Sequence, residues 1–267
     1  MREIPIALQA AEAASRIVRS KFGMVQRVMA KNGNPKDVVT DTDLASEKRI
    51  LQILRKHFPS YNVHSEEAGI HQGTSEYTWV IDPIDGTTNF SREIPCVSVS
   101  IALVHRKRVI LGVISNPITN EVYVGEFHKG ATRNGKKIHV GSKKTIEKAF
   151  VCCEWWSRTP QFERQGIRIF SHFAKASSKI RYISGTVWNL TRVASGNFDI
   201  ETCDTSFLDI AAASRVITEA GGRLTDHRGK EIPAFSQDVH RIVAANPKLH
   251  AAALKELRIL GVRAIQR

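Results

Sequence analysis

Apolar and polar positions follow two different periods along the chain, and these periods predict both helices and strands. In residues 1–20, Ile4, Leu8, Ala11 and Ile17 fall toward one side of a helix, which is typical of an amphipathic segment. Polar residues interrupt this segment, so it lacks the continuous apolar run of a signal peptide. We therefore expect the chain to open with a helix of the folded protein.

A second helix is predicted in DLASEKRILQILRKHFP, after a stretch rich in turn residues, KNGNPKDVVTDTD. Leu44, Ile50, Leu51 and Leu54 recur there at helical spacing. Pro59 ends the segment because proline lacks the backbone donor that a helix needs. This helix would begin beside the acids of the VVTDTD motif.

The middle of the chain alternates short apolar runs with turn residues and predicts a sheet. The run Trp79–Ile81 is typical of a buried strand, and CVSVSIALV and RVILGVISNP flank a basic turn as an antiparallel pair would. EVYVGEF and KKIHV continue the sheet, with Asn134 and Gly135 as a tight turn between strands.

Helical periodicity returns in the second half, after a further strand predicted in AFVCCEWW. Helices are predicted near residues 161–176, in TVWNLTRVASG and in DIAAASRVITEAGG, where Asp209 stands at the start and Gly221 follows the end. RLTDHRGKEI and HRIVAANP are typical of closing strands. Because the sheet contains antiparallel hairpins, the pattern favours a layered α+β arrangement over a doubly wound parallel fold.

Length and composition are those of an ordinary globular protein. The 267 residues, with 42% apolar and 24% charged residues, can bury one large core or two tightly joined halves. No stretch approaches the ~18 consecutive apolar residues of a membrane span, and we expect a cytoplasmic protein. Cys96, Cys152, Cys153 and Cys203 show no CxxC spacing and no nearby histidine cluster, which argues against a zinc site and favours buried, reduced thiols.

The net charge of +13 leaves two interpretations open. Basic residues are scattered over residues 105–108, 133–137, 142–144 and the C-terminal segment, which indicates turns and solvated helix faces rather than a nucleic-acid stripe. Specific binding of nucleic acid is therefore the less favoured interpretation. An excess of positive charge also attracts small phosphorylated molecules over long range.

Acidic residues gather at the predicted element boundaries, where a rigid scaffold presents functional groups. They are Asp41 and Asp43, Glu66 and Glu67, Asp82 and Asp85, and Asp209. Each alone fits a turn, a solvated loop or a helix cap. Two carboxylates three residues apart, however, repel one another unless a cation or hydrogen-bond donors compensate them. Oxygen ligands of this kind suit Mg²⁺, which completes its shell with water and substrate phosphate.

The residues after the second acid of DPIDGTTNF fit a phosphate. If Gly86 and Thr87 open a helical turn, their backbone N–H groups form an anion site, and the threonine hydroxyl can orient a water. A cation-activated water beside a bound phosphate is the arrangement that hydrolyses a phosphomonoester.

DPIDGTTNF resembles the signature of the inositol monophosphatase family of Mg²⁺-dependent, often lithium-sensitive phosphatases. The partner motifs follow in the order of that family, with VVTDTD and SEE before it and LDIAAA…ITEAGG after it. The similarity runs through nearly the whole chain. It implies a five-layered αβαβα sandwich, one catalytic domain over residues 1–267 with two αβ halves meeting near residue 145, and a homodimer.

The resemblance also implies roles for individual residues. Glu66, Asp82 and the backbone carbonyl of Ile84 would hold the first metal, and Asp82 would bridge to a second metal held by Asp85 and Asp209. Asp43 and Thr87, with Glu66, would act on the attacking water. The substrate would contact Asp85, Gly86, Thr87, Gly185, Thr186 and Asp209. Two or three Mg²⁺ ions per site are implied, with Mn²⁺ as a substitute, and direct in-line attack by a metal-activated water.

The sequence departs from the family pattern before the last of these acids. Leu208 replaces the usual tryptophan, and the acid that inositol-specific members place upstream could be Asp199, Glu201 or Asp204. This stretch is closer to archaeal-type members that accept both inositol 1-phosphate and fructose 1,6-bisphosphate. Fructose bisphosphatase or dual activity is therefore an alternative, and an RNA- or acidic-partner-binding protein is another. Candidates for holding a second phosphate are Arg158, Arg181 and Lys175, for which a solvated charge is the favoured interpretation.

Overall fold

The computed structural model describes residues 1–24, 27–31, 33–155 and 160–262. Its helices are α1 (Glu3–Lys21), α2 (Asp41–His57), α3 (Thr87–Ser91), α4 (Pro160–Ala176), α5 (Thr186–Ala194), α6 (Phe207–Glu219) and α7 (Pro247–Ile259), with a short 3₁₀ turn at Ile146–Lys148. Among the described residues, no helix is long and apolar enough to cross a bilayer.

The strands form a hairpin and two sheets. The hairpin is β1 (Val28–Lys31) with β2 (Asn34–Thr40). The larger sheet orders β10 (Lys136–Lys137), β9 (Gly130–Arg133), β8 (Glu121–Glu126), β7 (Arg108–Asn116), β6 (Ser98–His105), β5 (Tyr77–Asp85), β3 (Asn62–Ser65) and β4 (Gly69–His71). The smaller sheet orders β12 (Lys179–Arg181), β11 (Phe150–Cys153), β13 (Ile200–Thr205), β15 (His240–Ala245) and β14 (Arg223–Asp226).

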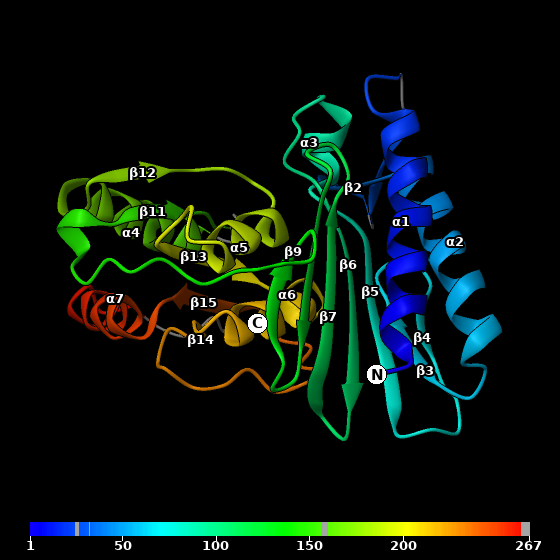
Figure 1. The fold of residues 1–267 in the computed structure, drawn as a ribbon. Coiled ribbons are helices and arrows are strands. Elements are labelled where there is room, and N and C mark those ends of the chain that lie inside the picture. The colour runs from blue at the N-terminus through cyan, green and yellow to red at the C-terminus, as the bar shows by residue number, and fades with distance from the viewer. Residues whose placement is uncertain (25–26, 32, 156–159, 263–267) are drawn as a thin grey trace.

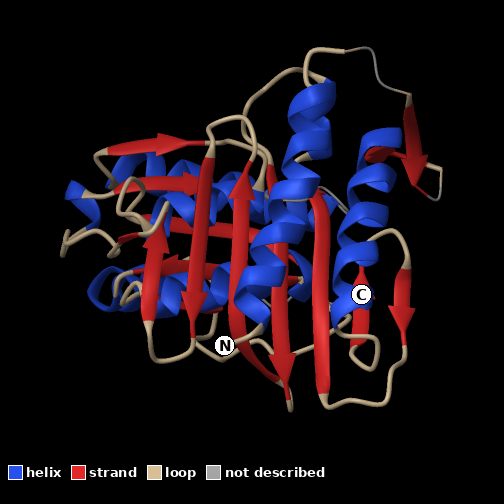
Figure 2. Cartoon of the chain, turned by 45° about the vertical axis from the view of Figure 1, so that its right-hand side comes forward, coloured by secondary structure: helices blue, strands red, loops and turns tan. Residues whose placement is uncertain are grey.

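Five layers stack in the order helix, sheet, helix, sheet, helix (Figure 1). α1 and α2 cover the outer face of the larger sheet around one apolar core, and Figure 2 shows helices in front of its strands. α5 and α6 lie between the two sheets and share a second core with residues of both. α4 and α7 cover the outer face of the smaller sheet around a third core. The predicted α+β fold, a five-layered αβαβα sandwich, is confirmed.

Two glycines let α6 approach the larger sheet closely. A Cβ added at Gly112 would lie 2.2 Å from the carbonyl oxygen of Ala212, and one at Gly125 would lie 2.7 Å from Cα of Val216. Any larger side chain on these strands would push the helix away, because packed interiors leave no spare room. The position of the start of α6, which carries Asp209, is thereby fixed against the larger sheet.

The buried face of α1 differs from the predicted one. Ala7, Ala10, Ala14 and Val18 are fully buried, whereas Ile4, Leu8 and Ile17 are only partly buried. Alanines allow the close packing of α1 on the adjacent helix and sheet, and the larger side chains flank that seam. The helix itself was predicted correctly.

Three further local predictions concern α2, the stretch before it and the turn at Asn134. Leu44 is 44% exposed on α2, while Ile53, which we did not single out, is buried. The turn-rich stretch before α2 contains the β1–β2 hairpin. The prediction of a tight turn at Asn134 is confirmed, since Asn134 and Gly135 both have positive φ between β9 and β10.

Candidate active site

The DPID segment forms the end of β5 and contains a bulge. Asp82 pairs with Ser100 of β6 and Asp85 pairs with Ser98, so three steps on one strand oppose two on the other. Proline is tolerated at such an irregularity, where no ladder donor is required. The bulge lets Asp82 and Asp85 both serve one site. The N–H of Ile84 donates to Oδ1 of Asp82 at 3.0 Å.

Glu66 reaches the same edge from the neighbouring strand. β3 runs parallel to β5, and the N–H of Glu66 donates to the carbonyl oxygen of Ile81 at 3.1 Å. Asp82 is 2% exposed. Its burial, followed by the charges of Glu66, Asp85 and Asp209, raises the pKa of Asp82 well above its usual value. The acids predicted from three separate motifs therefore share one electrostatic environment.

Asp85 faces the start of α5. Its Oδ2 accepts hydrogen bonds from the backbone N–H groups of Val187, at 2.9 Å, and Trp188, at 3.4 Å. These donors at a helix start favour the charged carboxylate. Burial and the charge of Asp209 outweigh them, so the pKa of Asp85 is still raised well above its usual value.

Gly185 and Thr186 lie beside Asp85, as the predicted substrate contacts would require. Gly185 caps α5 with φ of 127°, and a Cβ there would lie 2.9 Å from the carbonyl oxygen of Cys96. Thr186 begins the helix, and its hydroxyl donates to Oε1 of Glu154 at 2.7 Å. Residue 185 must be glycine because its positive φ is unfavourable for other residues and because a Cβ would collide with the carbonyl oxygen of Cys96.

Asp209 occupies the third residue of α6, so our interpretation of it as an N-cap is wrong by position. Ser206 is the cap, and the two form a capping box. Oδ2 of Asp209 accepts from the N–H of Ser206 at 3.0 Å and from the hydroxyl of Thr205 at 2.8 Å. These bonds hold the carboxylate at the edge of the acidic cluster, where it raises the pKa values of Asp82 and Asp85.

Thr87 and Asp43 meet on the other side of the cluster. The hydroxyl of Thr87 donates to Oδ1 of Asp43 at 2.8 Å and lies 3.1 Å from the carbonyl oxygen of Ile84. Asp43 is fully buried, and burial raises the pKa of its carboxyl group. Its Oδ2 accepts from the N–H of Thr40, the cap of α2, at 2.9 Å. A single hydroxyl proton thus lies between a carboxylate and a carbonyl.

Gly86 joins β5 to α3 with φ of 86° and is the cap residue of that short helix. A Cβ at this position would lie 2.7 Å from the carbonyl oxygen of Cys96. The segment that contains Cys96 therefore packs against both Gly86 and Gly185. This packing brings the two predicted substrate-binding segments together.

Lys31 is a residue that the sequence reasoning missed. Its Nζ lies 2.6 Å from Oε1 of Glu66 and 2.5 Å from Oε1 of Glu67. Burial opposes the charged form of Lys31, but the two carboxylates together raise its pKa. Burial also raises the pKa of Glu66 to about 7, although Lys31 counteracts it. No periodicity indicated Lys31, because the hairpin that carries it was interpreted as turns.

Glu47 is a second missed residue, one turn after Asp43 on α2. Its Oε1 accepts from the N–H groups of Glu67, at 2.9 Å, and Ala68, at 3.1 Å, and from the hydroxyl of Ser65. It thereby fixes the turn that presents Glu66. The available signal was its spacing of four residues from Asp43, which places both on one helix face.

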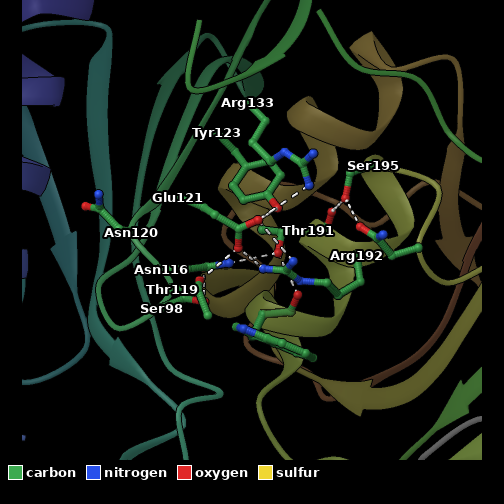
Figure 3. Close-up of polar contacts among 12 residues, drawn as sticks. Ser98, Asn116, Thr119, Asn120, Glu121, Tyr123, Arg133, Thr191, Arg192 and Ser195 are labelled. Carbon is green, nitrogen blue, oxygen red and sulfur yellow. Dashed lines mark hydrogen bonds and ion pairs between the residues drawn. The ribbon is translucent and has the colours of Figure 1, made fainter. Parts of the chain in front are cut away.

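A network of polar side chains joins α5 to the larger sheet (Figure 3). Arg192 of α5 pairs with Glu121 of β8, which also receives Arg133 at 3.4 Å. The amide of Asn116 donates to the hydroxyl of Thr191 at 3.1 Å. These contacts tie α5 to the larger sheet, and the start of the same helix binds Asp85. The network positions one acid of the cluster without touching it.

The three acids considered upstream of Asp209 have different environments. Asp204 forms a bidentate pair with Arg241, at 2.7 and 2.6 Å, on the side of the sheet toward α4. Asp199 accepts from the N–H of Phe150 at 2.9 Å. Glu201 is fully buried near Glu154. None of these contacts singles out the counterpart of the family's upstream acid.

Of the basic residues considered for a second phosphate, Arg158 lies outside the described residues. Arg181 stacks over the ring of Phe150 at 5.3 Å, and Lys175 is exposed on α4. Arg106 and Lys107 both have positive φ and form the turn between β6 and β7, which confirms the basic turn predicted there.

The donor set of the cluster fits divalent cations that prefer oxygen. Carboxylates from β5, from the turn after β3 and from α6 converge, and their burial, together with their mutual repulsion, raises the pKa values of Glu66, Asp82 and Asp85. Such repulsion is relieved when a cation lies among the acids. The ammonium of Lys31 shows that one edge of the cluster already takes a positive group.

Together the fold and the cluster define a phosphatase of the metal-dependent class. The model of the inositol monophosphatase family matches residues 2–261. The chain belongs to this family, and it is a phosphomonoesterase. This confirms the resemblance carried by the DPIDGTTNF motif and its partners.

Three relatives illustrate the range of the family. The chain is 35% identical to inositol monophosphatase 3 of Solanum lycopersicum, over 95% of this chain and 96% of that protein. It is 33% identical to a fructose-1,6-bisphosphatase/inositol-1-monophosphatase of Thermotoga maritima, over 88% and 87%. It is 31% identical to the Nus factor SuhB of Pseudomonas aeruginosa, over 95% and 94%.

A solved structure agrees with the fold over nearly its whole length. The extragenic suppressor protein suhB of Bartonella henselae superposes with a TM-score of 0.90 at 29% sequence identity. The match covers 97% of this chain and 99% of that one. The layered arrangement described above is therefore the arrangement of this family.

Proposed function

We propose that the chain hydrolyses an inositol monophosphate in an Mg²⁺-dependent reaction, by direct in-line attack of water. The observation that carries this proposal is the convergence of Asp82, Asp85, Glu66 and Asp209 at one sheet edge, next to the Thr87–Asp43 pair. When bound, Mg²⁺ supplies a Lewis acid that lowers the pKa of water and neutralises charge on the leaving oxygen.

The residues that would hold the cations are those of the acidic cluster. Glu66, Asp82 and the carbonyl of Ile84 would form one set, and Asp82, Asp85 and Asp209 a second. In support, Asp82 is the acid whose pKa responds to Glu66, Asp85 and Asp209 alike, which fits a bridging carboxylate. Mn²⁺ also prefers oxygen ligands and is the expected substitute.

Thr87 and Asp43 would orient the attacking water and receive its proton. The Thr87 hydroxyl bonds to Asp43, so its oxygen lone pairs are aimed by a buried carboxylate. A raised pKa makes Asp43 a better proton acceptor at neutral pH than an exposed aspartate, because the driving force for proton transfer increases. Glu66 would assist from the opposite side of the cluster.

The phosphate and the sugar ring would lie between two glycine segments. Backbone N–H groups of Gly86 and Thr87 would bind the phosphate. Gly185 and Thr186 would contact the ring, since Gly185 lies close to Asp85 and leaves room where any side chain would intrude. The resemblance further implies a homodimer and inhibition by lithium, which light scattering and a lithium titration of turnover would test.

Fructose 1,6-bisphosphate is the rival substrate within the same chemistry. The relative from Thermotoga maritima carries both activities in its name. The test is phosphate release with Mg²⁺ from inositol 1-phosphate, fructose 1,6-bisphosphate, glycerol 2-phosphate and adenosine 3′,5′-bisphosphate. A kcat/KM for inositol 1-phosphate more than ~10-fold above the rest, or ~1.4 kcal/mol, supports the proposal. Equal or faster turnover of the bisphosphate assigns the dual activity instead.

Binding of RNA is the second candidate, from another class of function. It is favoured by the charge of +13 and by the 31% identity to a relative named as a Nus factor. Electrostatic binding of this kind weakens steeply with salt. A mobility shift with RNA at physiological ionic strength that disappears at high salt would support it, and no shift at any salt concentration would exclude it.

A further inference from the structure

A second group of acids and thiols lies next to the catalytic cluster, in the core that α5 shares with the smaller sheet. β11 and β13 run parallel, and Cys152 pairs with Glu201 in their register. The carboxylates of Glu154 and Glu201 and the thiol of Cys203 each have an atom within 4.8 Å of the other two. All are buried, and none belongs to the acids proposed for catalysis.

The alternation of side chains along the two strands creates this group. Cys152 and Cys203 belong to the core shared with α5 and α6. Cys153, the next residue along β11, belongs to the core beneath α4 and α7 on the other side of the same sheet. Glu201 and Cys203 are two residues apart on β13 and therefore point to one face.

Several acceptor atoms in this group lack a hydrogen bond of ordinary geometry. Both carboxylate oxygens of Glu201, which is 0% exposed, lack a hydrogen bond of ordinary geometry, and the side chains beside them are the thiols of Cys152 and Cys203 and the amide of Asn189. Oδ1 of Asn189, on α5, is likewise buried and unpartnered. Buried acceptors without donors are rare in folded proteins and cost free energy. Three such atoms, with thiols as neighbours, favour a positive partner for the group.

The residues that the structure describes, 1–24, 27–31, 33–155 and 160–262, place no basic side chain in an ion pair with this group. In the described part of the chain, neither Glu154 nor Glu201 forms an ion pair. Arg241 pairs with Asp204 toward the other face of β13. Glu154 accepts a hydrogen bond from Thr186, which leaves the charge of its carboxylate uncompensated.

We propose that Glu154, Glu201 and Cys203 form a second metal site, for a cation of the Zn²⁺ class, with Cys152 beside it. A mixed set of thiolate and carboxylate ligands suits Zn²⁺, whereas Mg²⁺ prefers oxygen alone. The thiol of Cys203 releases its proton to solvent as the metal–sulfur bond forms. The sequence argued against zinc because these ligands have no short spacing, and the sheet register brings them together.

The site adjoins the catalytic centre through one residue. Thr186, which begins α5, donates to Glu154, and the preceding glycine lies close to Asp85. Cation occupancy would fix Glu154 and hence the start of α5. The proposal itself does not depend on phosphatase activity, because its ligands are separate from those of the catalytic cluster.

The experiment is a titration of the metal-free, reduced full chain with Cd²⁺. Binding is monitored by the thiolate-to-metal charge-transfer absorption band. We expect one equivalent per chain to produce the band. The band should persist in an Asp82→Asn/Asp85→Asn double variant, in which the catalytic cluster is impaired. It should disappear in Cys203→Ser and weaken at least 10-fold in affinity in Glu201→Gln.

Two thiol controls define where the band arises. Cys153→Ser removes an equally buried thiol from the opposite face of β11 and should leave the band unchanged. Cys96→Ser removes a thiol that senses the charge of Asp85 and should also leave the band unchanged. If Cys203→Ser does not fold, the isosteric Glu201→Gln decides the question.

Two results would overturn the proposal. The first is the absence of the band in the folded wild-type chain with excess Cd²⁺, which would mean that Glu154 and Glu201 share a proton instead of a metal. The second is a band of unchanged strength and affinity in folded Cys203→Ser or Glu201→Gln protein.

Discussion

Replacing Glu154 with glutamine should change how the stability of the metal-free protein depends on pH. Glu154 is 5% exposed. Burial, with the charges of Asp209 and Asp204, raises its pKa from 4.5 to about 7, against the hydrogen bonds from Thr186 and the N–H of Gly185. In the unfolded chain the carboxyl group returns to its ordinary value.

The sign of the effect follows from the protons bound. Between pH 4.5 and 7 the folded protein holds the proton of Glu154 and the unfolded chain has released it. The free energy of unfolding therefore falls as pH rises through this window and levels off above it. A pKa difference of ~2.5, at ~1.4 kcal/mol for each pKa unit, corresponds to roughly 3 kcal/mol.

The assay is urea unfolding followed by tryptophan fluorescence at pH 5 and pH 7.5, in the presence of EDTA. Because pH 5 already lies inside this window, wild type should lose roughly 2 kcal/mol more between the two pH values than Glu154→Gln, which keeps an acceptor for Thr186. Glu231→Gln, at an exposed position, is the matched control and should behave as wild type. Identical pH dependence in wild type and Glu154→Gln would refute the reasoning.

Three further changes test other parts of the structure. Thr87→Val removes the hydroxyl that bonds to Asp43, so kcat should fall ~100-fold with little change in KM, as phosphate-release assays would show. The midpoint of thermal unfolding, measured by calorimetry, should change little. Gly86→Ala forces a φ of 86° and a contact of 2.7 Å with a carbonyl oxygen, so unfolding should become easier by at least ~1–2 kcal/mol in urea titrations. Asp204→Asn leaves the buried guanidinium of Arg241 without its counter-charge and should lower the free energy of unfolding by ~3–5 kcal/mol in the same titrations. A decrease under ~1 kcal/mol would contradict the importance of that pair.

Local patterns predicted the elements that carry the catalytic acids. The apolar periodicity of α2 and α6 predicted both helices, and Asp43 and Asp209 lie in their first turns, but their caps, Thr40 and Ser206, were not predicted. The apolar run before Asp82 indicated β5. These features depend on neighbours within a few residues, which is why a single sequence reveals them.

Contacts between distant segments could not be predicted in this way. The strand β13 and the helix α7 were missed, and the hairpin that carries Lys31 was interpreted as turns. The pairing of Lys31 with Glu66 joins residues 35 positions apart. Glu154 and Cys203 meet only because β11 and β13 become neighbours. Sequence spacing carries no information about such pairs without the register of the sheet.

The ligand assignments came from the resemblance and remain predictions, although the geometry groups the residues as the resemblance implied. Neither Asp199, Glu201 nor Asp204 lies where its contacts would identify it as the ring-binding acid.

The most direct test of the central claim is phosphate release from inositol 1-phosphate by Asp82→Asn protein at saturating Mg²⁺. Asparagine keeps the shape of the side chain but removes the charge that a bridging ligand provides. A folded variant, checked by circular dichroism, should lose at least ~1,000-fold in kcat/KM, or roughly 4 kcal/mol of transition-state stabilisation. A folded variant that retains activity within ~3-fold of wild type would contradict the assignment of this acidic cluster as the catalytic metal centre.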